Sequence, residues 1–241
     1  AVDAHGALTF NNGGSSGVLN IGTVGDTTGL TSTGAVTLSG VSDLDIGASI
    51  SAGTSVTINA GSRHIDLGTE TSGKLSLTDA EIDRITATSL TLATTGNVTN
   101  SADVRAGSLS AMTINTGQGI TNSGDGVLGF SHIDTGALTL SSTGTADGYG
   151  VGTQSQYLVT AGASELVLSS ARDVRVNARN ADHTAAINLD KLHITSTSGA
   201  ASNSAYSVLS SGATLTLGRT TGPNWYQADQ QGALGTYTVA L

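Results

Sequence analysis

One short pattern recurs along this chain of 241 residues: an apolar residue, a polar residue and a second apolar residue. The clearest units are residues 36–38, 56–58, 75–77, 90–92, 112–114, 138–140, 166–168, 174–176, 192–194 and 215–217. Counted on the first residue, the step from one unit to the next varies, and most steps are long enough for two or three short strands with their corners. Repetition of this kind is typical of solenoids, in which each repeat packs only on its neighbours.

The alternation within each unit predicts short strands that bury one face. Gly, Ser, Asn and Asp flank the units, and these residues tolerate tight corners. No segment shows an apolar period of 3.6 residues over three helical turns. We therefore expect an all-β fold, a single-stranded parallel β-helix whose coils of about 20 to 28 residues stack about 4.8 Å apart.

A β-sandwich is the main structural alternative. It needs many hairpins, and Asn-Gly and Asp-Gly are their strongest short signals. Such pairs occur only at Asn12-Gly13, Asp125-Gly126 and Asp147-Gly148. Three signals are too few for a sandwich of this length, so the solenoid is preferred.

The composition limits the possible binding partners and the kinds of residue that can form the core. Aromatic residues make up only 3% of the chain, so the core must consist of Val, Ile, Leu and Ala. The abundance of β-branched residues argues against disorder. Nine basic residues stand against 18 acidic ones, a net charge of −9 that offers no surface for nucleic acid or anionic membranes. Cysteine is absent, and no apolar run is long enough for a transmembrane helix.

Two regions are expected along the solenoid. Residues 1–217 should form the β-helix coils. Residues 218–241 contain the only Pro and the only Trp, and the strand pattern returns only near the last residues. We expect this second region to be an atypical last coil or a loop decoration, continuous with the solenoid.

Two stretches resemble known repeats. Residues 75–92, with the run Glu-Ile-Asp-Arg-Ile-Thr-Ala before a short strand, resemble a repeat of filamentous-haemagglutinin-like exoproteins. Residues 166–178, a strand, a corner of small residues and a second strand, are similar to the haemagglutinin repeat. The two stretches cover only a small part of the chain, whereas a likeness in composition covers most of it.

This resemblance implies a right-handed β-helix in a secreted bacterial surface protein. The implied role is adhesion or service as a stalk, outside the outer membrane, after export by a two-partner or autotransporter route. An outer-membrane transporter and a host or bacterial cell-surface receptor or glycan are the implied partners. The family has no shared catalytic residues, so neither an enzyme nor a cofactor or metal site is expected. No secretion domain is recognisable, so we expect an internal segment.

Two groups of residues are candidates for ligand binding. Arg172, Arg175 and Arg179 form the one local concentration of basic residues and could bind an anionic glycan. Trp225 and Tyr226 could stack on sugar rings. The competing interpretations are charge compensation by nearby aspartates and packing between coils.

Three other patterns have simpler explanations. Asp79, Glu81 and Asp83 would share one face if extended, but Arg84 offers an ion pair instead of acid–base chemistry or calcium binding. The triplet His-Ile-Asp occurs at 64–66 and 132–134 without the converging ligands that zinc needs. Residues 13–17 match the G-x-S-x-G pattern, yet lack the flanking strand and helix that it requires.

Other functions remain open on the same fold. A polysaccharide lyase or hydrolase would need charged residues clustered in a groove, and acidic residues here are spread from Asp3 to Asp229. An ice-binding solenoid would need threonine at one fixed coil position, which the irregular coil lengths argue against. Exposed coil ends also make end-to-end self-association a prediction.

Overall fold

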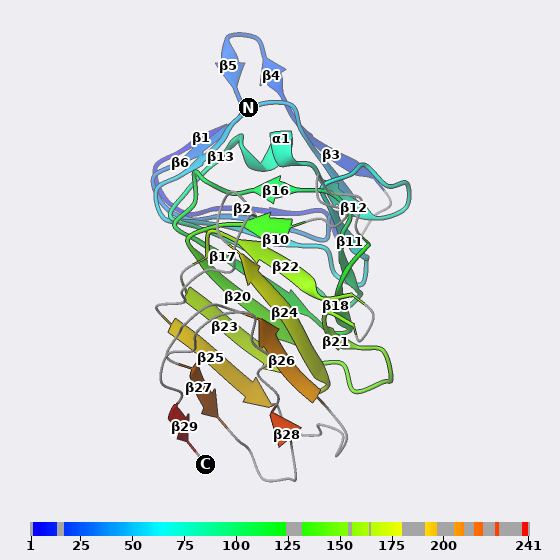
Figure 1. The fold of residues 1–241 in the computed structure, drawn as a ribbon. Coiled ribbons are helices and arrows are strands. Elements are labelled where there is room, and N and C mark those ends of the chain that lie inside the picture. The colour runs from blue at the N-terminus through cyan, green and yellow to red at the C-terminus, as the bar shows by residue number, and fades with distance from the viewer. Residues whose placement is uncertain are drawn as a thin grey trace.

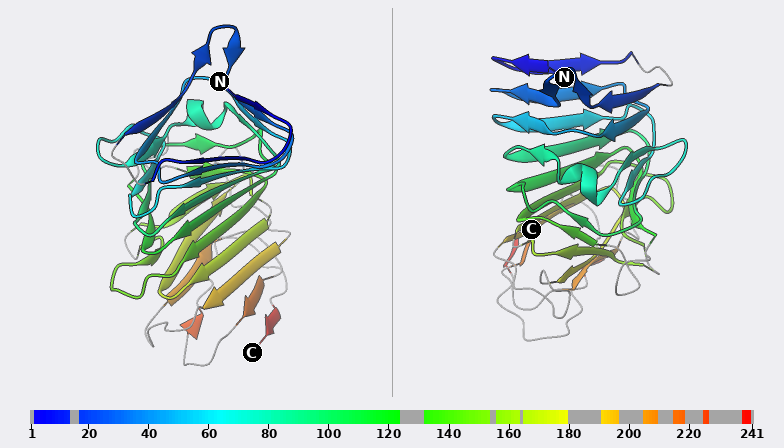
Figure 2. Two further views of the ribbon diagram at one scale, coloured as in Figure 1. Left: turned by 180° about the vertical axis from the view of Figure 1, so that it is seen from behind. Right: turned by 90° about the horizontal axis from the view of Figure 1, so that it is seen from above.

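The computed structural model describes residues 2–13, 17–123, 132–153, 156–163, 165–179, 191–196, 205–209, 215–218, 225–226 and 238–240. These residues form an all-β structure whose strands pair in parallel, with one antiparallel pair. In the ten-stranded sheet, strands that follow one another along the chain lie side by side from the N-terminal to the C-terminal end (Figure 1). Figure 2 shows the same stack from behind and from above. The all-β class and the parallel pairing that the sequence predicted are confirmed.

The largest regular feature is a ten-stranded parallel sheet, called the long sheet. Its strands follow one another in chain order, so each circuit of the chain adds one strand beside the last. They are β2 (Leu8–Asn11), β7 (Val36–Ser39), β10 (Ser55–Asn59), β14 (Ser89–Thr94), β17 (Ala111–Thr116), β20 (Ala137–Ser142), β23 (Glu165–Ser170), β25 (Lys191–Ser196), β27 (Leu215–Gly218) and β29 (Thr238–Ala240).

A second large sheet runs beside the long sheet. Its main path is β12-β11-β15-β18-β21-β24-β22-β19-β16, and β26 pairs with β24 and β28. The long strand β24 joins its two parts because it pairs with both β21 and β22. The strands are β11 (Ile65–Leu67), β12 (Leu75–Leu77), β15 (Val98–Asn100), β16 (Val104–Arg105), β18 (Gly119–Asn122), β19 (His132–Asp134), β21 (Gly150–Val151), β22 (Leu158–Ala161), β24 (Asp173–Arg179), β26 (Ala205–Leu209) and β28 (Trp225–Tyr226).

Smaller elements complete the N-terminal half. A four-stranded parallel sheet has the order β1-β6-β9-β13, and β3 pairs in parallel with β8. A short antiparallel hairpin, β4 with β5, stands out from the neighbouring strands in Figure 1. The bounds are β1 (Val2–Ala4), β3 (Val18–Ile21), β4 (Thr23–Val24), β5 (Thr27–Thr28), β6 (Leu30–Ser32), β8 (Asp43–Ile46), β9 (Ile50–Ala52), β13 (Ile85–Thr86) and helix α1 (Asp79–Ile82).

The core consists of stacked aliphatic columns. In the long sheet, Ile58 lies in register between Leu38 and Leu92, and all three side chains are fully buried. The alternating strand residues that point inward repeat this arrangement, and those that point outward are polar or small. Small branched side chains suit this packing, because each one fills the space between the equivalent side chains of the two neighbouring strands.

Buried hydroxyl groups hydrogen-bond to the backbone at the corners that follow the long-sheet strands. Thr94, Thr116 and Ser142 are in register at the strand ends, and all three are buried. The Thr94 hydroxyl donates to the carbonyl of Arg63 and accepts from the backbone N–H of Gly96 at 2.9 Å. Thr116 and Ser142 donate in the same way to carbonyls one coil earlier. These bonds satisfy backbone groups that a tight corner leaves without ladder partners.

Two of the sequence units lie on a different sheet from the rest. Residues 75–77 form β12 and residues 174–176 lie in β24, both in the second sheet. The register of the long sheet passes directly from Val56 to Leu90. The step that we counted from residue 56 to residue 75 is therefore wrong as a coil step. The physical reason is that the chain loops out after β11 and returns to pair β12 with β11 in parallel.

The C-terminal strands continue the two large sheets. Strand β28 pairs in parallel with β26, and β29 pairs in parallel with β27. Most of residues 218–241, the predicted atypical last coil, lie outside the described residues. Its special character therefore stays a prediction.

Candidate functional site

The outward face of the long sheet presents uncharged side chains in register over six strands. Its central column consists of threonine at every strand from β2 to β20, flanked on one side by Ser and Ala and on the other by Asn, Ser and Ala. The central column, called the threonine column, is Thr9, Thr37, Thr57, Thr91, Thr113 and Thr139. A face of this kind can make many similar hydrogen bonds along a long partner.

Irregular coil lengths do not disturb the threonine column, contrary to the sequence-based expectation. The long coil from Val56 to Leu90 and the shorter coil from Leu90 to Met112 both bring the chain back to the same register. The additional residues of the long coil form the loop 68–74, strand β12 and helix α1, which lie outside the ladder. Variation in length is therefore absorbed away from the long sheet.

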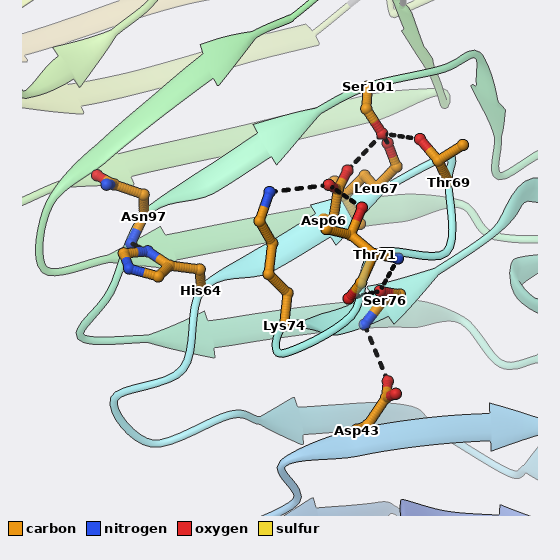
Figure 3. Close-up of polar contacts among 10 residues, drawn as sticks. All are labelled: Asp43, His64, Asp66, Leu67, Thr69, Thr71, Lys74, Ser76, Asn97 and Ser101. Carbon is orange, nitrogen blue, oxygen red and sulfur yellow. Dashed lines mark hydrogen bonds and ion pairs between the residues drawn. The ribbon is translucent and has the colours of Figure 1, made fainter.

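A second candidate site surrounds a buried carboxylate (Figure 3). Asp66, the middle residue of β11, has a side chain that is only 3% exposed. Its Oδ2 accepts from the Lys74 Nζ at 3.0 Å and from the Thr71 hydroxyl at 2.7 Å, and its Oδ1 accepts from the Ser101 hydroxyl. The Ser101 hydroxyl also contacts the Thr69 hydroxyl. We call these five residues the Asp66 network.

The Asp66 network fastens the loop 68–74 to the strands beneath it. Strands β11 and β12 pair in parallel and are joined by this loop alone, with Ile65 in register with Leu75, so the connection must be compact. Both carboxylate oxygens of Asp66 are occupied by donors from this loop and from Ser101. A carboxylate whose two oxygens are both hydrogen-bonded in this way can hold the loop in place. It is poorly suited to act as a general acid or base, because that role needs access to a substrate proton.

Neighbouring polar contacts connect the region around the Asp66 network to adjacent strands. The Asp43 carboxylate at the start of β8 accepts from the backbone N–H of Ser76 in β12 at 3.2 Å. On the opposite side, the His64 Nδ1 accepts from the backbone N–H of Asn97 at 2.9 Å. Side chains thus replace ladder bonds where the strands stop pairing, as Figure 3 shows. The use of His64 as an acceptor explains its position without a metal.

The sequence analysis missed the Asp66 network because it considered Asp66 only as part of the His-Ile-Asp triplet. The signal that could have revealed it is the polar stretch 68–74, which separates two apolar units that follow each other closely. Such a stretch must form a tight parallel connection, and a tight connection brings its own side chains over the preceding strand. All three residues of β11 are consequently buried.

The acidic run near residue 80 folds differently from the extended form that we considered. Residues Asp79–Ile82 form the short helix α1, so Asp79, Glu81 and Asp83 do not alternate along a strand. Glu81 is buried and accepts from the Ile46 backbone N–H at 2.9 Å, and it caps the helix through Thr78. The expected ion pair with Arg84 is not the contact found: the Arg84 guanidinium donates to the Ile46 carbonyl at 2.8 Å.

The pKa of Glu70, in the loop held by the Asp66 network, depends in part on the buried carboxyl group of Glu81. Partial burial raises the pKa of Glu70 above 4.5, and the negative charge of Glu81, a hydrogen bond with it, and the charges of Asp43 and Asp45 raise it further. A carboxyl whose pKa is higher in the folded state destabilises that state once it ionises. The penalty is therefore present at neutral pH and disappears as the pH falls below the ordinary pKa.

We expect Glu70→Gln to raise the urea midpoint of unfolding at pH 7 and to leave it unchanged near pH 4. Urea denaturation at the two pH values checks this expectation. Asp26→Asn, at the exposed tip of the hairpin, is the control and should leave the urea midpoint unchanged. A pH-independent effect of Glu70→Gln would contradict the electrostatic explanation.

The predicted basic candidates lie together on and beside strand β24, and two of them are engaged by carboxylates. The Arg172 Nη2 lies 3.3 Å from the Asp147 carboxylate, and its Nε donates to the carbonyl of Thr145. The Arg175 Nη2 lies 3.2 Å from the Asp173 carboxylate. Arg179 ends β24 and also has an interaction partner. Local pairing reduces the charge that these residues offer to an anionic glycan, which stays a prediction.

Most of the remaining candidate side chains lie outside the part of the chain that the structure describes. Trp225 and Tyr226 form strand β28, but their side chains lie outside the described residues. Residues 14–16 of the G-x-S-x-G match lie outside them as well. The first His-Ile-Asp triplet begins one residue before β11 and the second forms β19, and these strands are not neighbours in the second sheet. Stacking of Trp225 and Tyr226 on sugars therefore stays a prediction.

Comparison with known proteins identifies no family for this chain. No protein-family model, no curated protein and no solved structure matches this chain. Within the described ranges, no group of three or more His, Cys, Asp or Glu side chains could hold a metal ion. Over the same ranges, no helix is long and apolar enough to cross a membrane.

Proposed function

We propose that this chain is a segment of a right-handed parallel β-helix that serves as an adhesive or stalk-forming part of a secreted bacterial surface protein. The observation that carries the proposal is the outward face of the long sheet, whose uncharged columns stay in register over six strands. The resemblance of residues 75–92 and 166–178 to filamentous-haemagglutinin-like repeats supports the same assignment.

A continuous β-helix is the simplest path through the observed pairing. Within residues 2–122, each circuit contributes one strand to the long sheet and further strands to the other parallel sheets. Right-handedness is proposed because nearly all connections between parallel strands of one sheet are right-handed. A rod of this kind would hold a binding region away from the cell surface and present repeated side chains along its length.

The experiment for the proposal combines shape with attachment. Small-angle scattering of the purified chain should give an elongated particle. Beads coated with the folded chain should attach to epithelial cells or bacteria several-fold more often than beads coated with heat-unfolded chain, and soluble chain should compete. An elongated particle without attachment would leave only the stalk role, whereas a particle with no long dimension would contradict both roles.

The threonine column gives a specific reason to consider an ice-binding function as a second candidate. Its six hydroxyl-bearing residues occupy one fixed coil position, which is the arrangement that ice binding would need. A thermal hysteresis measurement on the purified chain distinguishes this candidate. A freezing point below the melting point would favour it, and coincident temperatures would reject it.

A further inference from the structure

A groove runs along the long sheet beside the threonine column. It is a cavity of about 480 Å³, open to the outside, at the C-terminal ends of strands β10, β14, β17 and β20. Asn59, Ala93, Asn115 and Ser141 follow one another in register along it, one from each strand. The groove therefore crosses four successive coils and runs along the direction of stacking.

Small residues make the surface hollow at this place. Ala93 stands between Asn59 and Asn115, so the column lacks a long side chain at its middle. The corner residue Gly117 cannot be replaced by a larger residue without a clash, because a Cβ there would lie 2.7 Å from the Thr95 carbonyl oxygen. The hollow thus follows from the close approach of two coil corners.

The groove offers hydrogen-bonding groups that the protein does not use. Asn59 accepts from the backbone N–H of Gly61 through its Oδ1 at 2.9 Å, which fixes its side chain and leaves its amide N–H groups available. Among the described residues, the side chains of Asn115 and Ser141 make no hydrogen bond, and Asn115 is exposed. An amide offers both donors and an acceptor, and a hydroxyl offers either.

The chemistry of these groups favours a neutral sugar polymer. The residues that line the groove include no charged side chain, so it has no partner for a carboxylate or sulfate. The net charge of −9 also repels anionic polymers at long range. The column positions recur once per coil, about 4.8 Å apart, a length comparable with one pyranose ring in an extended chain. Three of the four positions carry polar groups, and Ala93 occupies the second. Methyl groups of Ala93 and of the flanking threonines can contact the C–H faces of such rings.

We propose that this groove binds an extended neutral oligosaccharide, laid along the stacking direction, with Asn59, Asn115 and Ser141 hydrogen-bonding to the first, third and fourth of four successive sugar units. The inference rests on the proposed adhesive function and adds to it a site and a class of ligand. A shallow groove with a few neutral hydrogen bonds should give a dissociation constant of about 1 mM for a short oligosaccharide. Tight attachment to a surface would then depend on many sites acting together.

Cellohexaose is the first probe, with chitohexaose as a second neutral probe and a heparin-derived hexasaccharide as the anionic one. NMR spectra of the isotope-labelled chain report weak binding residue by residue. We expect a neutral probe to shift the side-chain amide signals of Asn59 and Asn115 and the backbone amide of Gly117. The heparin-derived probe should leave these signals in place.

Two matched variants locate the binding. Ala93→Gln fills the middle of the groove and should weaken binding about tenfold. Ala111→Gln is the control, because Ala111 is a half-buried alanine of the same sheet at the opposite flank of the threonine column. It should change affinity less than about twofold. Circular dichroism melting curves of both variants establish that each is folded.

The outcomes separate this inference from the proposed function. Signal shifts confined to other residues, or equal effects of Ala93→Gln and Ala111→Gln, would overturn the groove while leaving adhesion intact. The same conclusion follows if neither neutral probe shifts the groove signals but the coated beads still attach to cells. If the beads fail to attach and the neutral probes still shift the groove signals, the adhesive role fails and the groove stands as a binding site.

Discussion

Replacing Asp66 by alanine is expected to lower the free energy of unfolding by about 3 kcal/mol, because it leaves the donors of a buried network without their acceptor. Lys74, Thr71 and Ser101 all donate to this carboxylate, which is 3% exposed. Lys74 is 30% exposed and can be rehydrated in part, so we place the loss at the low end for a buried pair. Urea denaturation measures the change.

The control for Asp66→Ala is Asp45→Ala, in the neighbouring strand β8. Asp45 is exposed, and its removal should cost less than about 0.5 kcal/mol. Asp66→Asn keeps one acceptor oxygen and should fall between the two. Hydrogen exchange should show the loss of protection concentrated in residues 65–77, the two strands and the loop that the network joins. Equal effects of Asp66→Ala and Asp45→Ala would show that the network contributes nothing to stability.

Replacing Gly29 by alanine should be comparably damaging, at about 3 kcal/mol, for a different reason. Gly29 has a φ of +72°, in a region that costs other residues about 1–2 kcal/mol. A Cβ at this position would also lie 2.0 Å from the Ser49 carbonyl oxygen. That oxygen accepts from the backbone N–H of Leu30 at 2.9 Å, so relief of the clash must disturb the pairing of β6 with β9.

Gly25 provides the matched control for this substitution. It lies at the tip of the hairpin that ends just before Gly29, with a φ of +61°, but a Cβ there would meet no atom within 4 Å. Gly25→Ala should therefore cost only the conformational term, about 1 kcal/mol. The difference between the two variants in urea denaturation isolates the contact with Ser49. Equal losses would mean that the coils separate readily at this corner.

Much of the fold could be predicted because the apolar-polar-apolar unit fixes both the strand and its buried face. Units such as Val56-Thr57-Ile58 and Leu90-Thr91-Leu92 became neighbouring strands with identical register. Which sheet a unit joins could not be predicted, as residues 75–77 show. Their pattern is the same as in the long-sheet strands, and only the three-dimensional course of the loop 68–74 places them beside β11. Helix α1 was missed because four residues are too few for a helical period.

The candidate sites were predictable only in part. Clusters in the sequence, such as Arg172 and Arg175, were easy to find, and the structure pairs both with nearby aspartates. The groove was not visible in the sequence, since Asn59, Ala93 and Asn115 come from three different coils of unequal length. Sites built across coils depend on register, and register depends on how much chain each coil loops out. A search at fixed spacing cannot detect them.

The alignment of the ladder hydrogen bonds has a mechanical consequence for a chain pulled from its two ends. These bonds link each long-sheet strand to the strands of the preceding and following coils, so they point along the stack. Tension along the stack would act on all of these bonds, and they would break one coil at a time. The chain would then lengthen in steps, each releasing one coil, with the largest step from the long coil between Val56 and Leu90. A stalk of this design would yield gradually under shear, dissipating force coil by coil while its remaining coils stay folded.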